Sequence, residues 1–169
     1  MPGTIVVKRK HIVWGVLVLA LVAILALLPS LRRSTTPDTP EVAGERIAAV
    51  ILTLDYRKRE AWQQALWPLC NEEGQEFWQR QIDHGFWNGV EESRRITDEV
   101  IVEGAEAVEM TLEDGSLAAL VIVQGRVLTH DEAGERFDEG FYQRLVLTKR
   151  IGGHWLLETL IDPQLFEGG

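Results

Sequence analysis

A continuous apolar run, IVWGVLVLALVAILALL from Ile12 to Leu28, contains no charged residue and limits what the start of this chain can form. Extended to Leu31 the run has 20 residues. At about 1.5 Å of rise per residue, a helix of this length covers the ~30 Å hydrocarbon core of a bilayer. A buried helix of a soluble domain would carry a polar face, which this run lacks. We therefore predict a transmembrane helix over residues 12–31, with Trp14 at the membrane interface.

A cleaved signal peptide is the alternative explanation of this run, because the basic residues Lys8, Arg9 and Lys10 precede it. A signal peptide would have a shorter apolar core and would end in a small-x-small cleavage site. This run ends instead in LLPS, residues 27–30. The sequence favours a helix that stays attached to the chain.

The basic flanks of the run predict its orientation, because Lys and Arg resist translocation across the membrane. Three of them precede the run, whereas Arg32 and Arg33 follow it. We expect residues 1–11 in the cytoplasm, residues 12–31 in the cytoplasmic membrane and the remaining chain outside the cytoplasm. Residues 32–39, RRSTTPDT, are polar and rich in Ser, Thr and Pro, as in a short tether. The predicted extracytoplasmic domain covers residues 40–166.

This predicted domain is strongly acidic. Residues 41–169 hold 25 Asp and Glu against 12 Lys and Arg. Such a surface repels phosphate backbones, because nucleic-acid binding depends on Lys and Arg displacing counterions. We expect no nucleic-acid partner, and a basic protein partner or self-association fits better. Cys70 is the only cysteine, so the chain has no intramolecular disulfide or C-x-x-C redox pair, and we expect this thiol to be buried.

The first half of the domain has the pattern of helices. Thr39 followed by Pro40 predicts an N-cap and a first helical residue, and apolar residues then recur at helical spacing to about residue 54. A second helical piece covers residues 57–66 and ends before Pro68, and a third covers about residues 72–84. Asn88 and Gly89 predict a turn that ends the helical half.

Aromatic residues are concentrated in these helical pieces and recur at the end of the chain. They either pack a helical layer against a sheet or line a pocket, and the sequence leaves both interpretations open. The residues concerned are Trp62, Trp67, Phe77, Trp78, Phe86, Trp87 and Trp155.

The second half has the pattern of antiparallel strands. We predict a strand over residues 96–102 and another over residues 107–112, followed by a hairpin turn at Asp114 and Gly115. The run 117–128 is nearly all apolar up to residue 123, which predicts a central strand covered on both faces, with a bulge at Gln124 and Gly125.

The last strands complete the predicted sheet. The acidic stretch 130–140 predicts a loop, residues 141–150 alternate as a strand, and a Gly152–Gly153 turn leads into a strand over residues 154–161. These elements predict an α+β fold: an N-terminal transmembrane helix followed by a helical layer packed on a curved antiparallel sheet of four to six strands.

Two stretches carry a resemblance to a known superfamily. The helical segment LTLDYRKREAWQQALWPLC (52–70) and the final hairpin LVLTKRIGGHWLLETLID (145–162) make the chain similar to nuclear transport factor 2-like domains. The resemblance implies a cone of helices and bent sheet. With a membrane anchor added, the chain also resembles single-pass assembly components of type IV secretion and conjugation channels, and Mce-associated proteins of actinobacterial envelopes. The resemblance implies a scaffold that binds other subunits.

Isomerases and dehydratases of the same superfamily are the alternative, because the cone can hold a general base and a hydrogen-bond donor. The candidates for such chemistry are Asp83 with His84 and His130 with Asp131. Either pair can equally be a helix end or a solvated loop. The four histidines lack metal-binding spacing, and the acidic clusters lack a calcium-loop pattern. We expect no catalytic residue, metal or cofactor, so a protein-interaction domain is the first hypothesis and a small-molecule or enzymatic pocket the second.

The predicted topology is tested by adding protease to cells whose cytoplasmic membrane is intact. Residues 40–166 should be digested in these cells, because they lie outside the cytoplasm, whereas residues 1–11 should be cut only after lysis. Immunoblots against tags at the two ends measure this. Digestion of the domain only after lysis would contradict the topology.

Overall fold

The computed structural model describes residues 38–149 and 153–161. The predicted cytoplasmic segment 1–11, the predicted anchor 12–31 and most of the tether 32–39 lie outside the described residues. Within the described ranges, no helix is both long enough and apolar enough to cross a bilayer.

Four α-helices and one short 3₁₀ helix form the first half of the described chain. Thr39 begins the first of them as predicted, since its hydroxyl accepts a hydrogen bond from the Val42 N–H at 3.4 Å, with Pro40 as the first helical residue. Asn71 begins α4 in the same way and accepts a bond from the Gly74 N–H at 2.8 Å. The helices are α2 (Pro40–Leu52), α3 (Arg59–Leu66), η1 (Trp67–Leu69), α4 (Glu72–Asp83) and α5 (Phe86–Ser93).

The predicted turn at Asn88 and Gly89 is wrong. Both residues lie inside α5, and the chain turns instead at Gly85, whose φ of +99° places it in the left-handed region that favours glycine. Asn and Gly are common in turns, but the apolar residues Trp87 and Val90 continue the helical spacing through this stretch and are buried. Packing of these two side chains outweighs the local turn preference.

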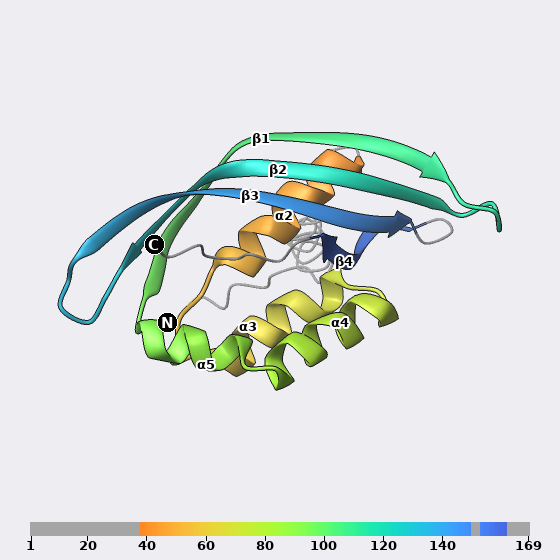
Figure 1. Ribbon diagram of the computed structural model, residues 1–169. Helices are drawn as coiled ribbons and strands as arrows, with labels where there is room; N and C mark the ends of the chain where they lie inside the picture. The colour runs from red at the N-terminus through yellow and green to blue at the C-terminus, as the bar shows by residue number, and fades with distance from the viewer. Residues whose placement is uncertain (1–37, 150–152, 162–169) are drawn as a thin grey trace, which may run out of the picture. The chain divides into compact units, whose positions relative to one another are not determined.

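The second half folds into one antiparallel sheet in the order β1-β2-β3-β4. The predicted meander is therefore confirmed. Figure 1 shows the sheet bent over the helices, all of which lie on its concave side. The strands are β1 (Ile96–Thr111), β2 (Leu117–His130), β3 (Arg136–Lys149) and β4 (Trp155–Ile161).

Strand β1 is a single strand of 16 residues, which corrects the predicted pair of shorter strands. Its register against β2 shifts between Thr97 and Glu99 and again between Val102 and Gly104. Each bulge moves the alternation of side chains by one residue, so the sequence loses its period of two in the middle of the strand. The predicted bulge in β2 is in fact on β1, opposite Gln124 and Gly125.

The sequence predicts the β1–β2 hairpin correctly and the β2–β3 hairpin only in part. The turn at Asp114 and Gly115 is confirmed, with Gly115 at φ +83°. The acidic loop predicted over residues 130–140 is shorter, because β2 ends at His130 and β3 begins at Arg136. Within the stretch assigned to that loop, Phe137 and Glu139 are half-buried between exposed neighbours, as in a strand with one inward face.

Strand β2 is central but is covered on one face only, which corrects the expected coverage of both faces. On the concave side Ala119, Val121 and Val123 are fully buried beneath the helices. On the opposite side Leu120 and Ile122 are only half-buried, because no described helix lies on that side (Figure 1). An apolar run in a strand does not by itself reveal whether a second layer exists.

A close contact between strands gives a test of this packing. A Cβ on Gly125 would overlap the carbonyl oxygen of Ile101 and lie 2.9 Å from Cε1 of Phe141. We expect Gly125→Ala to lower the free energy of unfolding by about 1–3 kcal/mol, because β1 and β3 must move apart. Urea denaturation followed by tryptophan fluorescence measures the change.

Gly89→Ala is the matched control, because nothing lies within 4 Å of its added Cβ and Gly89 is inside a helix. This substitution should leave the free energy of unfolding unchanged or raise it by up to about 1 kcal/mol. Equal effects of the two substitutions would contradict the packing described for Gly125.

Candidate protein-binding surface

The aromatic residues of the helical layer pack against one another and against the concave face of the sheet. Trp62 contacts Trp78 with ring centroids 5.3 Å apart and Trp87 at 5.4 Å. Trp62, Trp78, Trp87 and Trp155 are all buried in the hydrophobic core, and Trp67, Phe77 and Phe86 are partly buried around it. Four of the seven residues are thus part of the core, and the other three lie at its edge.

The pair Asp83 and His84 lies at the exposed C-terminal end of α4. Gln79 Nε2 donates a hydrogen bond to Asp83 Oδ1 at 2.9 Å, and His84 Nδ1 lies 2.6 Å from the carbonyl oxygen of Arg80, to which it donates. These are contacts within one helix and its end. The two side chains do not converge on an apolar interior, which acid–base chemistry in a cone would need.

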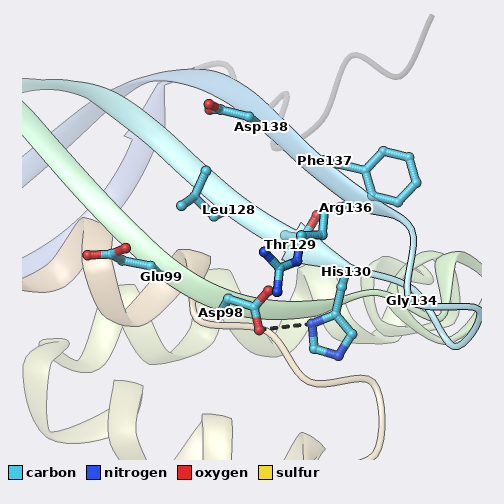
Figure 2. A pocket seen from close by; sticks show the side chains of 9 residues that line it. All are labelled: Asp98, Glu99, Leu128, Thr129, His130, Gly134, Arg136, Phe137 and Asp138. Atoms are coloured by element: carbon cyan, nitrogen blue, oxygen red, sulfur yellow. Dashed lines mark hydrogen bonds and ion pairs between the residues drawn. The ribbon is translucent and has the colours of Figure 1, made fainter.

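His130 contacts Asp98, which the sequence marks only as part of an acidic cluster, rather than its neighbour Asp131. The distance from His130 Nδ1 to Asp98 Oδ1 is 2.8 Å (Figure 2). Asp131 instead holds the β2–β3 turn, because its carboxylate accepts a hydrogen bond from the Glu135 N–H at 2.9 Å. The predicted pair is therefore divided between two separate interactions.

The His130–Asp98 pair lies in an open groove of about 830 Å³ beside the β2–β3 hairpin (Figure 2). Thr129 is the one hydroxyl among its lining residues. Neighbouring residues of a strand point to opposite faces, so the Thr129 hydroxyl points away from His130. The groove thus lacks the aligned nucleophile that a His–Asp pair would activate. It is lined by Asp98, Glu99, Leu128, Thr129, His130, Gly134, Arg136, Phe137 and Asp138.

Charged residues next to this groove pair with one another across the strands. Arg126 of β2 lies 3.1 Å from Glu103 of β1 and 2.9 Å from Asp138 of β3. All three side chains are about half exposed, so each pair contributes little stability. These ion pairs link three neighbouring strands at the surface. They do not resemble a catalytic group.

A second network holds the hairpin to the helical layer. The Tyr56 hydroxyl donates a hydrogen bond to Glu132, and Arg94 lies 2.8 Å from the same carboxylate. The bond from Tyr56 and the charge of Arg94 lower the pKa of Glu132, and the same bond raises the pKa of Tyr56. Nearby, Arg57 and Lys58 hold the pKa of Asp55 well below its usual range. These groups are anchored to one another at the surface, as expected of a structural junction.

Burial also makes the thiol of Cys70 unreactive. The thiol is buried against β4, and burial raises its pKa to about 12. At neutral pH it is therefore protonated and behaves as a small apolar residue. Within the described ranges, no three His, Cys, Asp or Glu side chains are grouped so as to hold a metal ion.

The convex face of the sheet carries apolar side chains from all four strands, with the polar residues Gln124, Arg144, Thr148 and Thr159 among them. Register places Val108 of β1 beside Leu120 of β2, and Leu120 beside Val146 of β3. The rows on either side add further apolar residues from all four strands. We call this set the outer sheet patch; it consists of Val108, Met110, Leu120, Ile122, Tyr142, Val146, Leu156 and Ile161.

The outer sheet patch is unusually open for apolar residues. Val108 is 65% exposed, Tyr142 57% and Met110 45%. Soluble domains rarely expose a contiguous apolar surface larger than about a few hundred Å² unless another molecule binds there. In the sequence, the nearly all-apolar run 117–123 of β2 is the part of this signal that can be seen, and it predicts a strand covered on both faces.

Solved structures that share this fold include a periplasmic domain and a periplasmic fragment. The periplasmic domain of DotI matches with a TM-score of 0.62 and 9% identity, over 75% of this chain and 94% of that domain. A periplasmic fragment of TraM matches with a TM-score of 0.56 and 12% identity, over 71% of this chain and 91% of the fragment. No protein-family model and no curated protein matches the sequence. The α+β architecture is therefore one already found in periplasmic domains.

Proposed function

We propose that this chain is a single-pass membrane protein whose extracytoplasmic domain binds other proteins in an envelope assembly, of the kind used for secretion, conjugation or envelope transport. The outer sheet patch carries the proposal. An apolar surface of this type has a free-energy cost in water that a protein partner removes by covering it.

Three further observations support the proposed place and role. The predicted anchor at residues 12–31 would hold the domain at the membrane. The two solved structures described above are a periplasmic domain and a periplasmic fragment. The sequence resembles anchored scaffold components of secretion and conjugation channels. We also assign the domain to the nuclear transport factor 2-like class, because its helices line the concave face of a bent sheet.

A small-molecule site on the concave face is the second candidate, and one residue favours it. Gln143 of β3 is 6% exposed, and neither its amide oxygen nor its amide nitrogen has a hydrogen-bond partner among the described residues. Burial of an unpaired amide is costly, so a polar guest beside it would be stabilising. An amide can orient a ligand but cannot act as a general base at neutral pH, so this candidate is a binding function.

Substitution of an exposed residue in the patch tests the proposed function. Tyr142→Glu would place a carboxylate at the partner surface, where burial without a counter-charge is unfavourable. We expect at least about tenfold weaker association, equivalent to ~1.4 kcal/mol. Quantitative co-purification of proteins from detergent extracts, at native expression, measures the effect. The free energy of unfolding should change by less than about 0.5 kcal/mol, because Tyr142 is largely exposed.

Ala65→Glu is the matched control, because Ala65 is exposed on α3 in the helical layer. This variant adds the same charge on the opposite side of the sheet and should retain the co-purifying proteins. Loss of these proteins with Ala65→Glu but not with Tyr142→Glu would place the interaction on the helices and contradict the proposal. Recovery of the unaltered chain only as an isolated monomer would contradict it as well.

A further inference from the structure

The two edges of the sheet differ in whether their backbone is occupied. At the β4 edge, Leu157 forms a parallel bridge with Cys70, and its carbonyl oxygen accepts a hydrogen bond from the Asn71 N–H at 2.9 Å. At the β1 edge, described pairing is confined to the start, where the Thr97 N–H donates to the carbonyl oxygen of Leu54 at 2.8 Å. The segment before α4 thus covers one edge, whereas no described residue pairs with the outer edge of β1 beyond its first residues.

The open part of β1 has regular strand geometry. From Gly104 to Thr111 all eight residues pair with β2 in unbroken register, and both bulges lie before this stretch. In an antiparallel strand, alternate residues direct their N–H and C=O groups to the other side. This stretch therefore presents a row of backbone donors and acceptors that an added strand could pair with.

The charge of β1 decides what kind of strand can pair there. The strand contains five acidic residues and no Lys, Arg or His. A second copy of this chain pairing through β1 would bring two acidic strands together, and like charges on adjacent strands are destabilising. Of these carboxylates, Glu106 and Glu109 lie in the regular stretch and are exposed. A segment with Lys or Arg at the facing positions would complement them.

The side chains around this edge also favour apolar residues in the partner. Register places Glu106, Val108 and Met110 on the convex side, next to Ile122, Leu120 and Ala118 of β2. The exposed edge therefore continues the outer sheet patch. An added strand would extend that face, with its apolar side chains beside Val108 and Met110.

We propose that residues 104–111 of β1 bind an extended segment of a partner protein that has basic residues opposite Glu106 and Glu109, on opposite faces of the sheet, and apolar residues opposite Val108 and Met110. The backbone edge supplies affinity, Glu106 and Glu109 select a basic strand, and Val108 and Met110 select its apolar residues. The same carboxylates disfavour pairing between copies of this chain in registers that place them opposite one another. The inference rests on the proposed function and names the chemistry of its partner.

Amide hydrogen exchange of the full chain in neutral detergent tests the inference. The probe is a blocked eight-residue peptide, matched to the eight residues of the regular stretch, with Lys opposite the two Glu positions, Val opposite Val108 and Met110, and Thr elsewhere. We expect exchange of the outward amides between residues 104 and 111 to slow by about tenfold or more at saturation, with no change in β4. High salt should weaken binding, because exposed charges are screened.

Two matched controls separate strand addition from simple charge attraction. A peptide of the same sequence with every backbone amide methylated keeps its charge but cannot donate a hydrogen bond along either edge, and it should not slow exchange. Glu106→Lys with Glu109→Lys should abolish the effect, whereas Glu91→Lys with Glu92→Lys, at exposed positions on α5, should preserve it. Equal slowing by the methylated peptide, or equal loss in both double variants, would overturn the inference.

Failure of this inference can be distinguished from failure of the proposed function. If no β1 amide slows with the probe peptide while Tyr142→Glu still releases co-purifying proteins, the interaction uses the convex face without an added strand, and the inference is wrong. If Tyr142→Glu releases nothing and the peptide still protects β1, the inference stands and the proposed use of the outer sheet patch is wrong.

Discussion

The packing of tryptophan-rich helices against the concave face of the sheet is the interaction on which the rest of this structure depends. Trp62, Trp78 and Trp87 contact one another there, and the fully buried side chains of β2 close the layer from above. Large aromatic side chains supply much of the buried area in a core. Because this one layer uses all the described helices, the convex side has no helix to cover it (Figure 1). The apolar surface proposed for binding follows from this one-sided arrangement.

Local rules predicted the elements whose boundaries are set by neighbouring residues. The cap at Thr39, the helices before and after Pro68 and the turn at Gly115 all follow from backbone chemistry within a few residues. The rules failed where distant packing decides. Helix α5 continues through Asn88 and Gly89 because its apolar residues reach the core, and β1 is one strand because its bulges are stabilised by pairing with β2.

The candidate surface could not be predicted from the sequence for a related reason. Leu120 and Ile122 are aliphatic residues like Val121 and Val123, yet only the latter pair is fully buried. An apolar side chain indicates that burial is favourable, but it does not reveal whether the covering layer belongs to the same chain. The acid–base candidates failed similarly, since His130 contacts Asp98, 32 positions away in the chain. Contacts between strands decide which polar residues meet.

Photochemical crosslinking in living cells tests the central claim, that the convex face of the sheet is the surface that binds other proteins. A photoreactive aromatic residue in place of Tyr142 would report contacts of the outer sheet patch, and the same residue in place of Gln64, exposed on α3, would report contacts of the helical layer. The account predicts adducts with other proteins from position 142 and none from position 64. Adducts from position 64 with none from position 142 would contradict it.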